Sequence, residues 1–288
     1  MWPKPLIRAR RDLTARGEVA ICFPPVTSVG FTPNALPTRL AALGWKKPLR
    51  VRGALTDAPR AVAIVGARAA TTIGMGRAHA IAKHLAARGV HVVSGGALGI
   101  DGAAHRGALA AGATTTVVLG TGVDVLYPER HAPLFDDVLA AGGALVSMLP
   151  DGTGPRRHTF TQRNKLIAAL ADVVIVVEAE TRSGSLSTAT AGQKLGRIVA
   201  AWPGSRGCDR LLDAGCALVE SVDDAALAAE GSPRMREPVT LDPIAARVRQ
   251  AIDAGCVSVD AIVRTTGLAV PAVLRALPLI EQTYARKL

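Results

Sequence analysis

The sequence has few aromatic residues, few cysteines and no long apolar run. Aromatic residues make up 3% of its 288 positions, so Ala, Val, Leu and Ile must build most of any hydrophobic core. Its four cysteines form no CxxC pair and no Cys/His set with the spacing of metal ligands. Reduced thiols of this kind are typical of a cytoplasmic protein, and we expect no metal site. The longest apolar stretch, residues 166–179, contains Asp172 and is too short to cross a membrane.

The chain carries an excess of positive charge, and this excess is unevenly spread. Thirty-four basic and 23 acidic residues give a formal net charge of +11. Residues 1–60 hold 11 basic residues against 3 acidic ones, whereas residues 61–230 hold 15 of each. Solubility or arginine-rich coding would explain this charge, and so would a partner that carries phosphate groups.

Apolar strands and amphipathic helices alternate through the middle of the chain. The run AVAIVG (61–66) ends in glycine, as a strand buried on both faces does. The pattern predicts a helix over 75–89, a strand over 90–94, a helix over 99–112 and a strand over 114–120. It predicts further elements at 134–141, 144–148, 162–170, 172–178, 186–195 and 198–201. Short, glycine-marked connections between such elements favour an α/β fold with a doubly wound, mostly parallel sheet.

Composition divides the chain into four parts. We interpret residues 1–36 as a basic lead-in without clear periodicity, and residues 37–230 as the sheet domain. Residues 231–242 (GSPRMREPVTLD) have the composition of a linker. Residues 243–288 contain three short helical patterns, and two of them flank a Gly-containing turn as in a helix-turn-helix. We therefore expect a small C-terminal helical domain with little sequence left for a β wing.

Four loops rich in Gly or Ser follow the predicted strands, at 66–76, 94–101, 120–124 and 178–188. The carboxyl ends of parallel strands meet at one edge of a sheet, where such turns expose backbone N–H groups. The loops therefore predict an anion-binding surface. The first loop lacks the GxGxxG spacing, and Ser94, Gly95 and Gly96 stand where a nicotinamide site usually has an acidic residue. We therefore expect no dinucleotide and no other cofactor.

Cationic and aromatic residues gather in and near these loops. Arg68 directly follows the strand at 61–66, and Arg182 precedes a Ser-Gly-Ser turn made of Ser183, Gly184 and Ser185. The segment HTFTQRNK (158–165) holds four candidates, Phe160, Arg163, Asn164 and Lys165. Arg and Lys bind phosphate groups, and an aromatic ring stacks on an unpaired base. This composition indicates a groove for single-stranded nucleic acid.

Each candidate also has an ordinary structural interpretation. Phe160 could fill the core, Gly95 and Gly96 could serve only a tight turn, and Asp101 could cap the N-terminus of the following helix. Glu178 stands at a strand end where a catalytic carboxylate could lie, but no second carboxylate or Ser–His pair is evidently placed to act with it. The motifs favour a nucleic-acid site as a set rather than one by one.

As a set, these segments resemble the DNA-processing protein A family (DprA, also called Smf). The matching stretches include AVAIVGAR (61–68), HVVSGGALGIDGAAHRGAL (91–109) and GALVSMLPDGTGPRRHTFTQRNKLIAALADVVIVVEAETRSGSLSTA (143–189). The resemblance implies a Rossmann-like sheet, followed by a winged-helix-like domain that is shortened in this chain. Two positions depart from the family's pattern, because Ala67 replaces a usual Ser and Leu98 replaces a common Arg.

The resemblance implies a dimeric, non-enzymatic protein of natural transformation that binds single-stranded DNA, protects it and helps to load the RecA recombinase. It places in the DNA pocket Arg68, Ser94, Gly95, Gly96, Phe160, Arg163, Asn164, Lys165, Ser183, Gly184 and Ser185. In that pocket, backbone N–H groups and Ser hydroxyls would bind phosphate oxygens, cations would neutralise charge, and Phe160 would stack on a base.

Two other functions stay open on the sequence. Related Rossmann-like phosphoribohydrolases cleave nucleotide glycosidic bonds with a PGGxGTxxE loop, and here the comparable strand end reads EAETRSGSLSTA, without Glu in that spacing. A pocket rich in N–H groups would also suit a sensor of a small nucleotide. Release of free base from nucleoside monophosphates would favour the enzyme.

Overall fold

The computed structural model describes residues 10–13, 19–22, 29–31, 36–236 and 242–285. Most of the predicted lead-in, residues 1–36, lies outside the described residues. Within it the structure gives three strands, which are β1 (Arg10–Leu13), β2 (Val19–Cys22) and β3 (Val29–Phe31). Part of the predicted linker, residues 237–241, also lies outside the described residues.

A nine-stranded sheet organises the described residues between 29 and 218. Its strands run in the order β12 (Ala217–Leu218), β11 (Ile198–Ala201), β10 (Val173–Val176), β5 (Ala61–Val65), β6 (His91–Ser94), β7 (Thr115–Val118), β9 (Ala144–Ser147), β4 (Leu49–Gly53) and β3. Neighbouring strands are parallel from β12 to β9, and β4 and β3 join antiparallel at one edge. The predicted doubly wound, mostly parallel sheet is thus confirmed.

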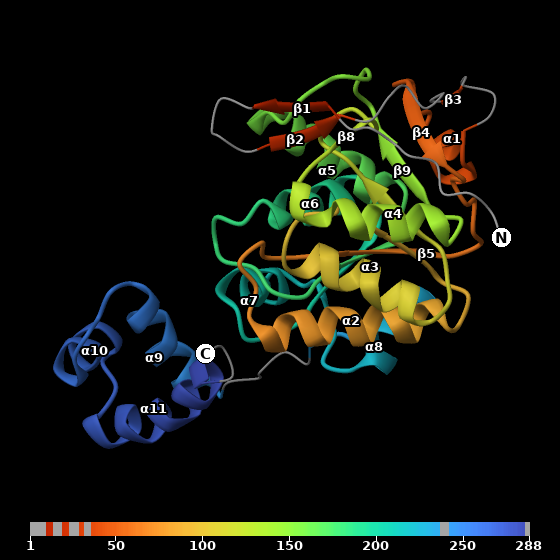
Figure 1. Ribbon diagram of the computed structural model, residues 1–288. Coiled ribbons are helices and arrows are strands. Elements are labelled where there is room, and N and C mark those ends of the chain that lie inside the picture. The colour runs from red at the N-terminus through yellow and green to blue at the C-terminus, as the bar shows by residue number, and fades with distance from the viewer. Residues whose placement is uncertain (1–9, 14–18, 23–28, 32–35, 237–241, 286–288) are drawn as a thin grey trace.

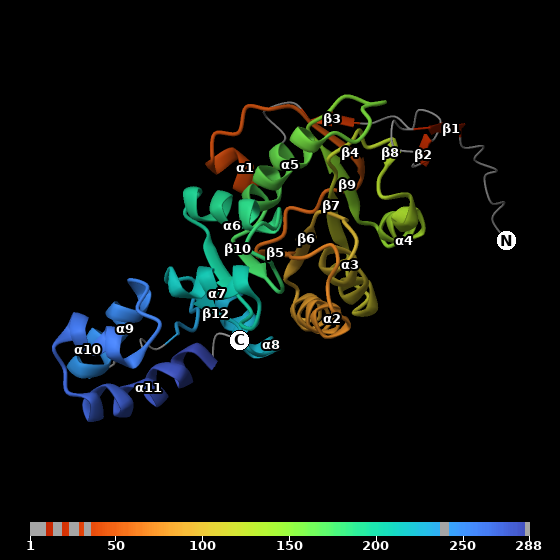
Figure 2. The same ribbon diagram turned by 90° about the vertical axis from the view of Figure 1, so that its left-hand side faces the viewer.

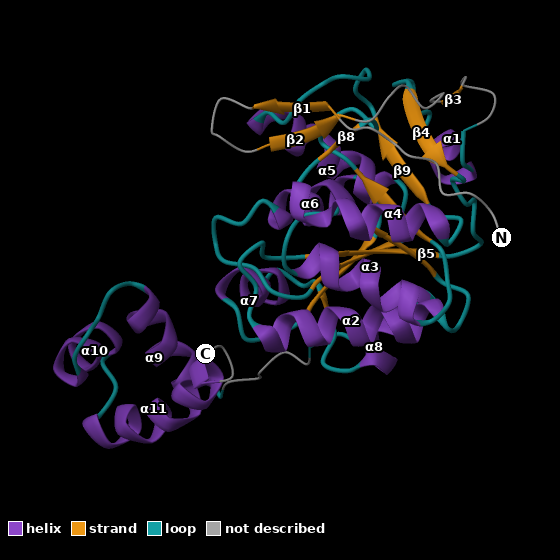
Figure 3. Ribbon diagram, viewed as in Figure 1, coloured by secondary structure: helices purple, strands orange, loops and turns teal. Residues whose placement is uncertain are grey.

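Helices cover both faces of this sheet, as Figures 1 and 3 show. Ala63 and Val65 of β5 point into the core on one face, and Val62 and Ile64 point into the core on the other. The first face is covered by α1 (Thr38–Ala42), α5 (Arg157–Ala169), α6 (Ser185–Lys194) and α7 (Arg206–Asp213). The second face is covered by α2 (Thr72–Ala86), α3 (Ile100–Ala110), α4 (Ala132–Ala140) and α8 (Val222–Ala229). All five residues of β5 are buried, which explains its continuous apolar run.

The order of the strands reverses beside β5. Going along the chain, β6, β7 and β9 extend the sheet on one side of β5, and β10, β11 and β12 extend it on the other. The loops that follow β5 and β10 therefore diverge to opposite faces and leave a crevice at the carboxyl ends of these strands. Ligands of open α/β sheets bind at such a switch point. Figure 2 shows β5 and β10 side by side in the middle of the sheet.

Residues 37–60, which lack a clear pattern in the sequence, form α1 and β4. In β4, Leu49 and Val51 are buried while Arg50 and Arg52 are partly exposed, so the strand is apolar on one side only. A second, three-stranded sheet joins β1 and β2 to the short strand β8 (Val125–Leu126), which a 3₁₀ turn at Glu129–His131 follows. None of these elements was expected from periodicity.

The C-terminal region forms three helices, α9 (Pro243–Asp253), α10 (Val259–Thr266) and α11 (Val270–Ala285), at the predicted helical patterns. They have a hydrophobic core of their own, to which Val248, Ile262 and Val273 each contribute from a different helix. Gly267 ends α10 with a φ of +68°, a left-handed conformation that favours glycine.

Among the described helices, no single one is both long and apolar enough to cross a membrane. One pair, Val259–Thr266 with Val270–Ile280, satisfies those criteria only together, and it is bent by 111° at its break.

Candidate nucleic-acid interface

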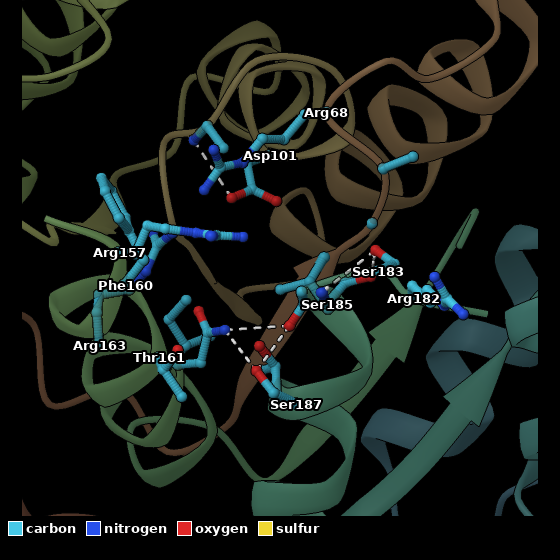
Figure 4. A pocket seen from close by; sticks show the side chains of 18 of the residues that line it. Arg68, Asp101, Arg157, Phe160, Thr161, Arg163, Arg182, Ser183, Ser185 and Ser187 are labelled. Carbon is cyan, nitrogen blue, oxygen red and sulfur yellow. Dashed lines mark hydrogen bonds between the residues drawn. The ribbon is translucent and has the colours of Figure 1, made fainter. Parts of the chain in front are cut away.

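A cavity of about 930 Å³ opens at the switch point of the sheet. Its wall is made by the loop after β5, the loop after β10, and the N-terminal half of α5. Figure 4 shows Arg68, Asp101, Arg157 and Phe160 on one side of this cavity, with Ser183 and Ser185 on the other. Of the four strand-end loops predicted to converge, those at 66–76, 94–101 and 178–188 contribute residues to this cavity, and the loop at 120–124 does not.

Close backbone contact holds the two loops together beneath the cavity. The N–H of Ala67 donates to the carbonyl of Glu178 at 2.7 Å. A Cβ at Gly66 would lie 2.8 Å from that same carbonyl oxygen and 2.5 Å from Cγ1 of Ile100. Glycine is therefore required at position 66 because any side chain would separate β5 from the loop that follows β10.

The carboxylate of Glu178 is occupied with a structural task. It accepts hydrogen bonds from the N–H of Thr71 at 3.1 Å and from the Thr71 hydroxyl at 2.6 Å. Thr71 is the N-cap of α2, so Glu178 places negative charge at a helix N-terminus, where it is stabilising. Glu178 is absent from the cavity wall. These contacts account for Glu178 without a catalytic role.

Phe160 lies on the cavity wall with cations over its ring. The guanidinium carbon of Arg68 lies 5.2 Å from the ring centroid and that of Arg163 lies 5.7 Å from it. The ring of Tyr127 packs at a centroid distance of 5.7 Å. Phe160 is half-buried. A base that stacked on the face of the ring that Arg68 covers would displace this guanidinium, which could then pair with a phosphate group.

Four exposed arginines give the cavity its positive charge: Arg68, Arg156, Arg157 and Arg182. Within the described part of the chain, none of the four forms an ion pair. The sequence reasoning missed Arg156 and Arg157 as site residues. Arg157 precedes Phe160 by three positions on one helix, and this spacing, which puts both on one face, was the available signal.

Hydroxyl groups line the opposite side of the cavity. The hydroxyls of Ser183 and Ser185 lie 2.7 Å apart, and the Ser183 hydroxyl also accepts from the N–H of Ser185 at 3.3 Å. Ser185 begins α6, whose N-terminal N–H groups face an anion favourably. Of the described residues, no three His, Cys, Asp or Glu side chains gather in a way that could hold a metal ion.

Arg163 is buried, and its guanidinium is already bonded. Its Nη1 donates to the carbonyl of Gly95 and, at 2.8 Å, to the carbonyl of Val118. Burial lowers the pKa of Arg163 to about 10, while the neighbouring Asp101 raises it. Only 5% of the residue is exposed, so its main contacts tie α5 to the ends of β6 and β7.

Asp101 lies in the first turn of α3, close to the guanidinium of Arg163. The prediction that it caps α3 is wrong, because the N-cap is Gly99 and Asp101 lies within the helix. Its Oδ2 accepts a hydrogen bond from the N–H of Ala97 at 3.3 Å. Burial raises the pKa of Asp101, and the positive charges of Arg163 and Arg68 oppose this rise. Asp101 therefore fixes the loop and balances part of the cationic charge.

Asn164 and the Ser94–Gly96 turn shape the wall. Nδ2 of Asn164 donates to the carbonyl of Gly184 at 3.1 Å and to the hydroxyl of Ser187 at 2.7 Å, which joins α5 to the start of α6. The hydroxyl of Ser94 is fully buried and donates to the carbonyl of Ile64 at 2.6 Å. A Cβ at Gly95 would lie 1.8 Å from Nη1 of Arg163.

The cavity thus brings together most of the predicted site residues, namely Arg68, Phe160, Arg163, Asn164, Ser183, Gly184 and Ser185. Ser94, Gly95 and Gly96 lie outside its lining and are buried. Lys165 is exposed on α5 but also lies outside the lining.

Comparison with known proteins identifies the family of the chain. The family model for DNA recombination-mediator protein A matches residues 33–230, and the model for the DprA winged helix domain matches residues 232–281. The chain belongs to the DNA recombination-mediator protein A family. The predicted resemblance is confirmed, and so is the winged-helix character of the C-terminal domain.

Relatives in this family are similar over much of the chain. A DprA protein of Mycobacterium tuberculosis is 42% identical over 239 residues, which cover 78% of this chain and 61% of the relative. The protein Smf of Escherichia coli is 44% identical over 146 residues, which cover 51% of this chain and 39% of the relative. The chain therefore matches about three fifths or less of the length of these relatives.

Two solved structures share the fold, and the match covers more of their own length than it does for these relatives. The DprA structure from Streptococcus pneumoniae superposes with a TM-score of 0.64 at 35% identity, covering 70% of this chain and 74% of that one. The DprA structure from Helicobacter pylori, described for its single-stranded DNA binding mode, superposes with a TM-score of 0.63 at 30% identity. It covers 69% of this chain and 93% of that one.

Proposed function

We propose that this chain binds single-stranded DNA in the cavity at the switch point and acts in DNA recombination without cutting the strand. The observation that carries this proposal is the combination of a half-buried ring, Phe160, with four exposed arginines that form no ion pair with a described residue. Membership of the recombination-mediator family and the DNA-binding mode described for the Helicobacter pylori relative support it.

The cavity offers a separate contact for each part of a nucleotide. Arg68, Arg157 and Arg182 would pair with phosphate groups, and the hydroxyls of Ser183 and Ser185 would donate to phosphate oxygens. Phe160 would stack on a base without reading its sequence. In this proposal Arg163, Asn164 and the Ser94–Gly96 turn build the wall, and Lys165 meets the strand outside the cavity.

We further propose that the protein acts as a dimer in the cytoplasm, protects incoming DNA during natural transformation and helps to load a RecA-type recombinase. These properties are carried over from the family resemblance. The rate at which recombinase filaments nucleate on single-stranded DNA, measured with and without this protein, tests the loading step. An unchanged rate would remove it from the proposal.

Binding is tested by fluorescence anisotropy with labelled oligo-dT and with a duplex of equal length, over a range of salt concentrations. Affinity for the single strand should fall as salt rises, with a logarithmic slope of about −0.7 for each neutralised phosphate. Arg68→Ala and Arg157→Ala should each reduce that slope by about one phosphate. Arg88→Ala is the matched control, because Arg88 is exposed beyond the other end of α2. Equal affinity of the Arg68/Arg157 double variant and the unaltered protein would refute the assignment.

The proposal that the chain does not cleave nucleotides has its own test. Glu178 and Asp101 accept hydrogen bonds from Thr71 and from Ala97, and a third carboxylate, that of Glu180, is exposed on the cavity wall with no described acidic side chain bonded to it. Incubation with nucleoside monophosphates should therefore release no free base. Release of base that Glu178→Gln abolishes would favour the phosphoribohydrolase instead, and saturable mononucleotide binding in preference to oligo-dT would favour a sensor.

A further inference from the structure

A second aromatic ring with a guanidinium on its face lies at the same edge of the sheet. Trp202 directly follows β11, the neighbour of β10, and its N–H donates to the carbonyl of Val176 at 2.9 Å. The guanidinium carbon of Arg77 lies 4.7 Å from the centroid of the Trp202 ring. This pair repeats the chemistry of Arg68 and Phe160 at the same carboxyl edge, at a strand that lies two places from β5 and four places from β7, after which Gly120 packs against Phe160.

The surroundings of Trp202 leave part of its ring accessible. Trp202 is half-buried and packs against the core beneath α2 and α8. Ile73 lies one helical turn before Arg77 on α2, and 68% of its surface is exposed. The indole N–H is not buried and makes no hydrogen bond to the residues that the structure describes. The exposed apolar side chain of Ile73 therefore lies on the same helix as Arg77, whose guanidinium covers the Trp202 ring, and the indole N–H of Trp202 is free to donate a hydrogen bond.

The chain between the two rings is open to solvent. Arg68, Ala69 and the segment 71–73 are exposed, and they lead from the wall of the cavity to Ile73. The carboxylate of Glu178 already accepts from the N–H of Thr71 at the start of α2. The negative charge of Glu178 disfavours a phosphate group at the N-terminus of α2. The surface near Ile73 and Trp202 therefore suits the apolar face of a base better than it suits a phosphate group.

We propose that Trp202, flanked by Arg77 and Ile73, is a second base-stacking site for the single strand whose first base stacks on Phe160. The inference rests on the proposed function and extends it, since it assigns a longer strand and a second contact point to the same edge of the sheet. Indole and guanidinium planes stack on all nucleobases, so the site accepts an unpaired purine or an unpaired pyrimidine. Phe160 packs against Gly120 after β7, and β7 lies four places from β11 in the sheet. Neighbouring strands lie about 4.8 Å apart, so the two rings are about 19 Å apart along the edge, and a few extended nucleotides bridge that distance.

The proposal predicts that the effect of Trp202 depends on strand length. Affinities are measured by anisotropy for labelled oligo-dT of three and of twelve nucleotides. Trp202→Met keeps apolar volume and removes the ring, and it should weaken binding of the twelve-mer about 5-fold or more while leaving the trimer unchanged. Trp202→Phe retains a ring and should recover most of the loss. Intrinsic fluorescence gives a second readout, since the chain has three tryptophans and the twelve-mer should quench emission that is absent from Trp202→Phe.

Arg77→Gln and Arg88→Gln form a matched pair, because each removes one positive charge, and Arg88 is exposed beyond the C-terminal end of α2, away from the Trp202 ring that Arg77 contacts. Only Arg77→Gln should weaken the twelve-mer. Thermal unfolding confirms that each variant is folded. Equal twelve-mer affinity of folded Trp202→Met and the unaltered protein, with no quenching, would overturn the second site while cavity binding stands. Failure of the unaltered protein to bind either oligonucleotide would overturn the proposed function itself.

Discussion

Replacing Arg163 with methionine should lower the free energy of unfolding of the sheet domain by about 3–5 kcal/mol. Arg163 is buried, and its Nη1 donates to the carbonyls of Gly95 and Val118. Methionine fills similar space without donors, so both carbonyl oxygens lose their partner. Each unsatisfied buried group costs about 1–3 kcal/mol, and the loss of the Coulombic attraction between Arg163 and Asp101 adds to the cost of the two carbonyls.

The same substitution should also change how stability depends on pH. Burial raises the pKa of Asp101 above its usual value, and the charge of Arg163 opposes that rise. Loss of Arg163 therefore raises the pKa of Asp101 further. In the variant, the folded state then holds a proton on Asp101 that the unfolded state has released, so stability falls as pH rises from the usual Asp range to the raised pKa. The destabilisation should be smaller at pH 4 than at pH 8.

Equilibrium urea unfolding at both pH values measures this effect. The midpoint of the variant should fall at pH 8 and recover part of the difference at pH 4, when Asp101 is neutral. A free-energy change below about 0.5 kcal/mol that is equal at both pH values would refute the reasoning, since surface substitutions have effects of that size. Arg163 would then be free to contact DNA directly.

Two further substitutions test how the cavity is built. Gly95→Ala should destabilise the fold by about 1–3 kcal/mol in urea, because its Cβ would lie 1.8 Å from Nη1 of Arg163. Gly76→Ala is its control: nothing lies within 4 Å of that Cβ, so alanine should stabilise α2 by up to about 1 kcal/mol. Glu178→Ala should lower the free energy of unfolding by about 2 kcal/mol, because the contacts to Thr71 are lost. An unchanged midpoint of thermal unfolding would contradict this.

Periodicity predicted the central sheet because each central strand is buried on both faces. The five residues of β5 are all buried, so the strand reads as a continuous apolar run in the sequence. In β4, by contrast, Arg50 and Arg52 alternate with Leu49 and Val51, and the helix before it has five residues. A short strand with cations on one side carries a weak signal, so α1 and β4 could not be predicted from their pattern.

The site itself was only partly predictable, because its residues divide into two groups by burial. Motif spacing indicated that Arg163 belongs to the site, but its carbonyl partners lie 68 and 45 residues away in sequence. No local sequence pattern reveals that the guanidinium of Arg163 already donates hydrogen bonds to carbonyl groups so distant in the sequence. Arg157, in contrast, is exposed on the cavity wall, and its spacing of three residues from Phe160 was a local signal that could have identified it.

Substitution of the buried arginine and of the exposed arginines should affect different measured properties. A guanidinium that bonds two strand-end carbonyls holds the cavity open whether or not a ligand is present, so its loss lowers stability first and affinity as a result. Exposed guanidiniums such as those of Arg68 and Arg157 make no ion pair with described residues, so their loss should lower affinity and its salt dependence at nearly unchanged stability. Unfolding and binding measured on the same variants should therefore move independently. Joint loss of stability and affinity in Arg157→Ala would place it with Arg163 in the wall and leave the phosphate contacts to Arg68 and Arg182.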